Sequence, residues 1–273
     1  MEVRKLFGEN DDEVLREDSE VGISTITLNR PETRNCLSIS MLNSLMSSVE
    51  AIKIDSSIRC IVLKANGVAF CAGHDLKELT NARNAEDKGQ AFFELTMRTC
   101  ADFMESIIKC PKPVIAAVEG IATAAGCQLV ASCDLAVAGR EAKFATPGVN
   151  IGLFCSTPMV ALSRNVPRKK AMEMLLLGDI VDAKSALEWG LINKITDAGK
   201  ALQEANFMAK KIASKSQKIV SIGKKTFYSQ TEYGVSEAYS FTSDIMVKNM
   251  LEMDAVEGIE AFLQKRIPKW SQF

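Results

Sequence analysis

Short runs rich in β-branched residues alternate along this chain with longer stretches that have helical apolar spacing. Runs at residues 23–29, 60–65 and 114–118 are separated by helical patterns, and a fourth run follows at 134–138. Strands joined by helices form a parallel sheet that helices cover. This alternation therefore predicts an α/β fold built from βαβ units.

Local signals predict the elements around these strands. Residues 13–17 are expected to pair with the first strand, which ends before Pro31 because proline cannot continue the ladder. Residues 66–73 are expected to form a loop. Helices are expected at residues 40–52, 87–109 and 128–132.

From residue 171 onward the strand signals end and helical spacing alone remains. The expected helices cover residues 172–177, 183–189, 201–214 and 235–265. We therefore separate a C-terminal helical region, residues 201–273, from a core at residues 1–200. An apolar stripe in the last of these helices is typical of a core or subunit contact. It comprises Phe241, Ile245, Met246, Met250 and Met253.

The charge balance excludes two classes of partner. Thirty-three basic and 34 acidic side chains leave a formal charge of −1, so no broad field attracts nucleic acid or an anionic membrane surface. No stretch reaches the roughly 18 consecutive apolar residues of a membrane-spanning helix. We therefore expect neither a nucleic-acid partner nor a membrane.

The cysteines and the amino terminus indicate the compartment. Eight cysteines are scattered without a C-x-x-C pair, and the chain holds one histidine. This pattern predicts buried, reduced thiols and no metal site. The amino terminus lacks the apolar core of a signal peptide and is too acidic for a transit peptide. We expect a cytoplasmic protein, or a protein of the mitochondrial matrix if a transit peptide has been removed.

Two segments rich in glycine and alanine follow predicted strands, at residues 70–75 and 124–128. Each can open a helix, whose first amides have no partner within the helix. Two such amides that converge on one oxygen would form an oxyanion hole. Close packing between helix and sheet explains small residues equally well, so the segments by themselves leave both interpretations open.

Seven ordered motifs, which span almost the whole chain, resemble the enoyl-CoA hydratase/isomerase (crotonase) superfamily. They are Leu28-Asn29-Arg30-Pro31 with Asn35, residues 70–76, residues 113–120, residues 133–136, Phe144-x-x-Pro147 with Gly152, residues 178–191, and residues 257–266. Residues 128–134 and 144–150 are similar to one particular branch of that superfamily.

The resemblance implies the crotonase (ClpP-like) fold, a spiral of stacked βαβ turns. It implies an acyl-CoA site within residues 1–200, with coenzyme A bound as part of the substrate and no separate cofactor. It also implies that residues 201–273 are a helical trimerisation region. The expected assembly is a homotrimer or a dimer of trimers.

The same resemblance assigns the two oxyanion-hole amides to His74 and Ala125. Such amides would polarise a thioester carbonyl and stabilise the enolate that forms from it. Further residues are expected to line the entrance for the acyl group or to contact the phosphates of coenzyme A. They are Arg34, Ala72, Asp75, Leu76, Lys77 and Lys265.

The chain departs from the superfamily at the two positions where hydratases carry glutamates. These positions hold Gln128 and Gly148. A glutamine amide does not titrate near neutral pH and glycine has no side chain, so neither can transfer a proton. We therefore expect weak or absent hydration of 2-enoyl-CoA.

Other groups are candidates to replace the missing glutamates. His74 is the single histidine, and an imidazole titrates near neutral pH. Asn150 follows the second lost position and could orient a water molecule. Cys127 and Cys155 are weaker candidates as nucleophiles because no second histidine is present to activate them.

Three functions remain open on this evidence. The chain could be a lyase or isomerase that acts on an acyl-CoA through the oxyanion hole. It could decarboxylate a malonyl- or methylmalonyl-type CoA, a reaction in which loss of carbon dioxide leaves the enolate without any base. It could also be an acyl-CoA-binding or regulatory protein that has lost the chemistry.

Overall fold

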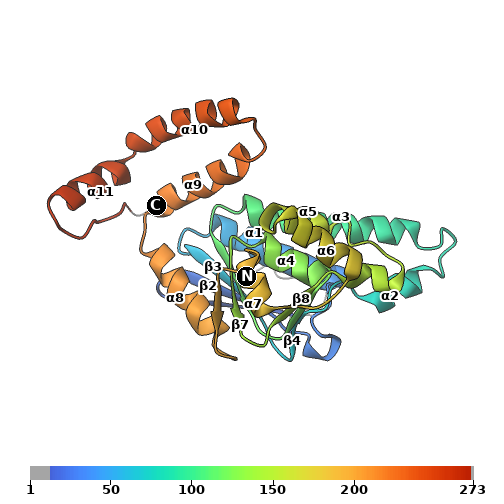
Figure 1. The fold of residues 1–273 in the computed structure, drawn as a ribbon. Helices are drawn as coiled ribbons and strands as arrows, with labels where there is room; N and C mark the ends of the chain where they lie inside the picture. The colour runs from blue at the N-terminus through green and yellow to red at the C-terminus, as the bar shows by residue number, and fades with distance from the viewer. Residues whose placement is uncertain (1–12, 272–273) are drawn as a thin grey trace.

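The computed structural model describes residues 13–271, and a six-stranded sheet forms its centre (Figure 1). In spatial order the strands are β1 (Val14–Asp18), β2 (Ile23–Leu28), β3 (Cys60–Ala65), β5 (Val114–Val118), β7 (Leu135–Gly139) and β10 (Lys194–Thr196). β1 is antiparallel to β2, and the other neighbours are parallel. The predicted α/β fold and the pairing of residues 13–17 with the first strand are therefore confirmed.

A second, four-stranded sheet was not predicted. It consists of β4 (Ala69–Cys71), β6 (Ile121–Thr123), β8 (Lys143–Ala145) and β9 (Val181–Asp182). β4 lies within the segment that was expected to be a loop. Strands of two or three residues are too short to show an alternating pattern, so only their pairing in the folded chain reveals them.

The large sheet is buried on both faces. In β3, Ile61 and Leu63 pack into the main apolar core, whereas Cys60 and Val62 pack into a second cluster on the opposite face. Because successive side chains of a strand point to opposite sides, this near-continuous apolar run is the pattern of a strand covered on both faces.

Helices on one side of the large sheet enclose the main core. They are α1 (Ile39–Ile54), α2 (Leu76–Ala82), α3 (Gln90–Lys109), α4 (Ala125–Ser132), α5 (Pro158–Asn165), α6 (Arg168–Leu177) and α7 (Ala183–Glu188), with 3₁₀ turns η2 (Pro31–Thr33) and η3 (Pro147–Ile151). No helix of residues 13–271 has both the length and the apolar run needed to cross a bilayer.

α8 (Ala201–Ala213) covers the opposite face of the large sheet. Its buried residues are all alanines, at positions 201, 205, 209 and 213. Alanines four residues apart form one face of a helix and allow its backbone to approach the sheet closely. α8 therefore packs with the core, although the sequence placed it in the C-terminal helical region.

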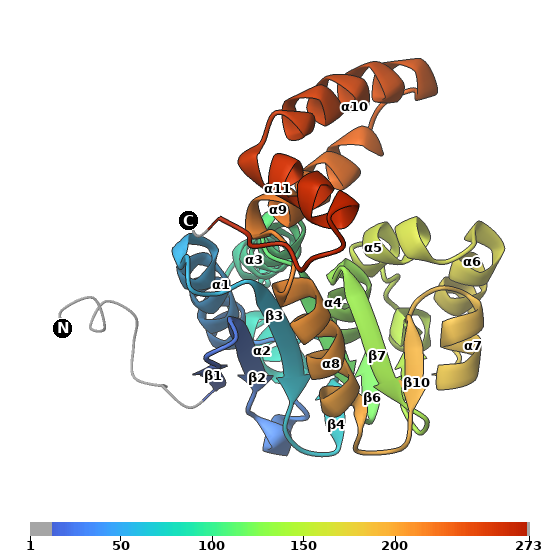
Figure 2. The same ribbon diagram turned by 90° about the vertical axis from the view of Figure 1, so that its left-hand side faces the viewer.

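α9 (Gln217–Gln230), α10 (Val235–Met250) and α11 (Met253–Leu263) form an arm that projects from the core (Figures 1 and 2). α9 had not been predicted, and a turn after Met250 divides the single helix expected at 235–265. The apolar stripe on this arm is exposed or half-buried; Met246, Met250 and Met253 are 56%, 49% and 78% exposed. The stripe is thus not part of the core of one chain.

A buried ion pair joins the arm to the core. Lys224 in α9 donates to a carboxylate oxygen of Asp134 over 2.7 Å, and also to the backbone oxygens of Ile107 and Lys112. Tyr228 donates to the other carboxylate oxygen of Asp134 over 2.9 Å. Asp134 therefore holds α9 at the start of β7.

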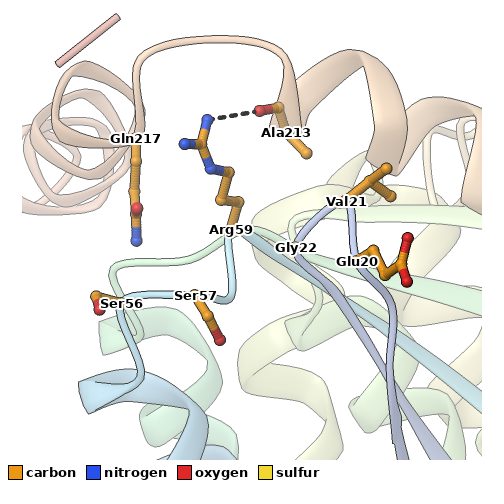
Figure 3. Close-up of a pocket in the computed structure, with 8 residues that line it drawn as sticks. All are labelled: Glu20, Val21, Gly22, Ser56, Ser57, Arg59, Ala213 and Gln217. Atoms are coloured by element: carbon orange, nitrogen blue, oxygen red, sulfur yellow. Dashed lines mark hydrogen bonds between the residues drawn. The ribbon is translucent and has the colours of Figure 1, made fainter. Parts of the chain in front are cut away.

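A shallow pocket lies where the arm leaves the core (Figure 3). Arg59 Nη1 donates to the backbone oxygen of Ala213 over 3.1 Å, and Gln217 Nε2 donates to that of Ile58 over 3.1 Å. The pocket contains none of the residues that the sequence assigned to a ligand site.

Candidate active site

The first of the two small-residue turns connects β4 to α2. Asp75 caps α2, because one of its carboxylate oxygens accepts hydrogen bonds from the amides of Lys77 and Glu78 at 2.8 and 3.3 Å. Gly73 has a φ of +93° and its oxygen accepts from the Leu37 amide over 2.8 Å. Leu37 and His74 form an isolated parallel bridge, in which the Leu37 amide bonds to the oxygen of Gly73, the residue before His74. The amide of His74 itself therefore points away from Leu37.

The second turn connects β6 to α4. Ala124 precedes the helix with φ 50° and ψ −118°, a backbone conformation that residues other than glycine rarely adopt. Its amide donates to the oxygen of Ala145 over 2.9 Å. Ala125 is the first residue of α4, and it is buried.

The two turns are in contact. A Cβ added to Gly73 would lie 3.0 Å from Ala124 Cβ and 3.5 Å from the Ala125 nitrogen. Thr123 Oγ1 donates to the oxygen of Ala72 over 3.1 Å. Within residues 13–271, neither the His74 amide nor the Ala125 amide donates a hydrogen bond to the backbone. Two unpaired amides on adjoining turns are the donors that an oxyanion would need.

The two positions at which the family resemblance leads us to expect glutamates, 128 and 148, lie on α4 and directly after the β8 segment. Gln128 lies on α4 and is 5% exposed, and its Oε1 atom has no hydrogen-bond partner. Gly148 is buried in η3, where an added Cβ would lie 3.0 Å from Cys155 Sγ and 3.1 Å from the oxygen of Leu153. The chain after Gly148 thus occupies the space that a larger side chain there would enter.

The imidazole of His74 is largely buried. Its Nδ1 atom lies 3.4 Å from the oxygen of Leu37, and its Nε2 atom is buried without a partner. Burial lowers the pKa of His74 below its ordinary value of 6.5, because a charged ring loses hydration there. The neutral ring donates from Nδ1 to the carbonyl, which leaves the lone pair on Nε2 available.

The other candidates for proton transfer or nucleophilic attack are less well suited. Asn150 is exposed, and its Nδ2 atom lies beside Gly178 at the end of α6. Burial raises the pKa of Cys127 to about 12 and also raises that of Cys155, so both thiols remain protonated at neutral pH. All eight cysteines are free.

The residues assigned to coenzyme A are only partly brought together. The oxygen of Arg34 accepts from the Ala72 amide over 3.0 Å, and Leu76 and Lys77 are exposed at the start of α2. Lys265 instead follows α11, and α11 and α2 lie at opposite ends of the molecule (Figure 1). Lys265 is therefore remote from the others within one chain.

Sequence reasoning did not single out Thr146, the residue after Ala145, whose oxygen accepts from the Ala124 amide. Thr146 follows β8 and is 1% exposed, and its hydroxyl has no hydrogen-bond partner. It lies within the Phe144-x-x-Pro147 motif, which was the available signal, but a motif does not reveal whether a hydroxyl is satisfied.

Comparisons with known proteins identify the same family that the sequence motifs resemble. The family model described as Enoyl-CoA hydratase/isomerase matches residues 18–273. Similar proteins include the mitochondrial enoyl-CoA hydratase domain-containing protein 3 of Homo sapiens and of Rattus norvegicus. They are 49% and 47% identical over 250 residues, which cover 92% of this chain and 81% and 82% of the relatives.

Solved structures agree with this match. The crystal structure of human enoyl-CoA hydratase domain-containing protein 3 has a TM-score of 0.89 at 46% identity, covering 94% of this chain and all of that one. An enoyl-CoA hydratase from Mycobacterium smegmatis has a TM-score of 0.90 at 47% identity, covering 94% and 98%. The branch to which residues 128–134 and 144–150 are similar is that of domain-containing protein 3.

Proposed function

Because the chain belongs to the enoyl-CoA hydratase/isomerase family and has its crotonase fold, we propose that it binds an acyl-CoA thioester between the amides of His74 and Ala125. Bound there, the thioester would be the substrate of a lyase or isomerase reaction that passes through an enolate. The observation that carries the proposal is the contact between two turns that each present an unpaired amide.

The chemistry follows from where charge develops. When the α-carbon of a thioester loses a proton or another group, negative charge moves to the carbonyl oxygen, and fixed amides stabilise it. One such donor typically contributes about a hundredfold to a thousandfold in rate. Ala125 also opens α4, so the positive end of the helix dipole would face the carbonyl oxygen of a thioester bound there.

Classical hydration requires two positioned acid–base groups, and Gln128 and Gly148 supply none. The neutral ring of His74, with Nε2 free, is the group best suited to carry a proton at this site. We therefore propose a reaction that needs one proton carrier, with slow hydration of 2-enoyl-CoA.

A second candidate is decarboxylation of a malonyl-type CoA. The absence of an acid–base side chain at 128 and 148 favours it, because loss of carbon dioxide leaves an enolate behind without a base. A binding-only role is disfavoured by the strained backbone of Ala124. Such a conformation costs on the order of 1–3 kcal/mol and persists at sites whose geometry function requires.

Assembly and location form part of the proposal. The exposed apolar stripe on α10 and α11 suits contact with further copies of this chain, as a homotrimer or a dimer of trimers. In such an assembly Lys265 would be available to a neighbouring subunit. The human and rat relatives are named as mitochondrial, which supports the mitochondrial matrix over the cytoplasm.

The decisive experiment compares two ligands that differ by one carbonyl group. Calorimetry would measure binding of butyryl-CoA and of S-butyl-CoA, the thioether that lacks the carbonyl. We expect the thioester to bind more tightly. Equal affinities for the two ligands would overturn the proposed oxyanion hole. Failure of both ligands to bind would overturn the proposed acyl-CoA site.

A parallel assay would follow hydration of crotonyl-CoA. We expect rates far below those of a hydratase that carries both glutamates. Ordinary hydratase rates would contradict the argument from Gln128 and Gly148 and would require another proton-transfer group.

A further inference from the structure

A single threonine hydroxyl joins the two turns of the candidate site. Thr123 ends β6, and its Oγ1 atom donates to the oxygen of Ala72 in the first turn over 3.1 Å. Outside the β4–β6 ladder, no other hydrogen bond of residues 13–271 connects residues 72–75 with residues 123–126. The hydroxyl therefore links the segment that leads to the Ala125 amide with the turn that carries the other free amide.

The first turn needs such a restraint because it contains Gly73. This residue has a φ of +93°, and glycine has a wider choice of backbone conformations than any other residue. The two peptide groups on either side of Gly73 can therefore rotate independently unless each is held from outside the turn.

Each of these two peptide groups is held through its carbonyl oxygen. The Gly73 oxygen accepts from the Leu37 amide over 2.8 Å, and the Ala72 oxygen accepts from Thr123. A trans peptide group is planar, with its C=O and N–H on opposite sides. The Leu37 bond therefore turns the His74 N–H away from Leu37, and the Thr123 bond holds the preceding peptide group.

The threonine hydroxyl is the stronger restraint on the peptide group between Ala72 and Gly73. The N–H of that group, which belongs to Gly73, is hydrogen-bonded to the sulfur of Cys71, and sulfur is a weak acceptor. Thr123 is β-branched, so its χ1 angle is restricted and its hydroxyl has a fixed direction from the strand. The first turn is thus oriented relative to β6, from which α4 and the Ala125 amide follow directly.

We propose that Thr123 is a positioning residue, whose hydroxyl orients the His74 amide relative to the Ala125 amide so that both donate to one carbonyl oxygen. This inference rests on the proposed oxyanion hole. Each donor of such a hole must lie about 2.7–3.1 Å from the oxygen, and hydrogen bonds weaken steeply as they bend. Loss of the hydroxyl should therefore weaken recognition of the carbonyl and leave the other ligand contacts intact.

The test uses calorimetry to compare butyryl-CoA with S-butyl-CoA, the thioether that lacks the carbonyl. Thr123→Val keeps the β-branched shape without the donor, and Thr123→Ala removes the donor without adding bulk. We expect both substitutions to lower the affinity for butyryl-CoA by roughly threefold to tenfold, the contribution of one hydrogen bond, with S-butyl-CoA unaffected. Thr123→Ser keeps the hydroxyl and should keep the wild-type ratio of the two affinities.

Thr196→Val is the matched control. Thr196 also ends a three-residue strand, β10, and it is half-buried like Thr123. Its hydroxyl likewise donates to backbone oxygens, those of Ala138 and Asp197, but it lies in the large sheet and Thr123 in the small one. We expect no change in the affinity ratio. A change as large as that in Thr123→Val would overturn the inference.

The infrared carbonyl band of bound butyryl-CoA is a readout that a merely structural role would not change. A carbonyl that accepts two hydrogen bonds absorbs at lower frequency than a free one, and a ¹³C label at that carbon separates its band from those of the protein. We expect the lowered frequency in the wild type and in Thr123→Ser. In Thr123→Val the band should return part of the way toward that of the free ligand.

Each way for the inference to fail has its own signature. Equal affinities of the wild type for the two ligands would overturn the proposed oxyanion hole and this inference with it. An unchanged preference and carbonyl band in Thr123→Val and Thr123→Ala would overturn this inference alone. A loss of preference in Thr123→Ser, or an equal fall in both affinities in Thr123→Val, would also overturn it, because the shape or stability of the turn would then matter instead of the hydroxyl.

Discussion

The carbonyl oxygen of Cys71 lies against the α-carbon of Gly126, so closely that a Cβ on Gly126 would be 2.2 Å away from it. Cys71 ends β4 and Gly126 is the second residue of α4. This contact holds the start of α4 against the end of β4, directly before the turn that contains His74. The close approach requires glycine because the obstacle is backbone, which cannot rotate aside.

Substitutions at Gly126 and Ala124 should have opposite effects. Gly126→Ala forces a methyl group against the Cys71 carbonyl and should reduce the free energy of unfolding by about 2–3 kcal/mol. Ala124→Gly relieves a positive φ that costs about 1–3 kcal/mol, against about 0.4–1 kcal/mol of added unfolded-state entropy. We therefore expect the free energy of unfolding of Ala124→Gly to exceed that of the wild type by about 1 kcal/mol. Urea unfolding of both variants checks these expectations. A lower free energy of unfolding in Ala124→Gly would contradict the inference that the backbone of Ala124 is strained.

The fold should tolerate a glutamate at position 128 but not at position 148. Gln128→Glu keeps the shape of the side chain. Gly148→Glu must displace Cys155 and the Leu153 carbonyl, and should lower the free energy of unfolding by about 1–3 kcal/mol. The double variant should therefore gain little crotonyl-CoA hydration over Gln128→Glu alone. A stable Gly148→Glu variant with a large gain in hydration would contradict this.

Stability should depend on the protonation of His74. Burial lowers its pKa below 6.5 in the folded chain, so below that pH the unfolded chain binds a proton that the folded chain does not. The free energy of unfolding should therefore fall as pH falls from 6.5 toward the lowered pKa, by up to about 1.4 kcal/mol per pH unit. Well above pH 6.5, where the imidazole is neutral in both states, His74 contributes no pH dependence.

His74→Gln should reduce that slope, because the chain contains no other histidine. Urea unfolding at about pH 5.5 and about pH 7.5 would compare the variant with the wild type. An unchanged slope in the variant would show that other groups cause the pH dependence.

Removal of the Lys224 cation should loosen the arm. Lys224→Met leaves Asp134 without its cationic partner, at a site where the two side chains are 6% and 15% exposed. Loss of one member of a buried pair typically costs about 3–5 kcal/mol. We expect lower stability and faster hydrogen exchange in α9. Lys225→Met is the matched control, since Lys225 is exposed, and equal effects of the two substitutions would argue against the ion pair.

Much of the architecture was predictable from local pattern. The runs at 60–65 and 114–118 match β3 and β5 residue for residue, because β-branched residues bounded by turns favour strands over short distances. β4 and β6 were missed, since three-residue strands exist only through the partners they pair with. α8 was assigned to the helical region because its alanine face indicates a helix but does not reveal the sheet it covers.

The sequence by itself determined which side chains are available at the candidate site: a single histidine at 74, and Gln128 and Gly148 at the two positions where the family resemblance leads us to expect glutamates. Glutamine and glycine cannot transfer a proton, wherever in the fold the chain places them. Only the tertiary structure decided which groups meet. It brought the two turns into contact, left Thr146 buried without a partner and separated Lys265 from Lys77 within one chain. The physical reason is that chemical capacity belongs to a residue, whereas proximity, burial and hydrogen-bond satisfaction arise between segments that are distant in sequence.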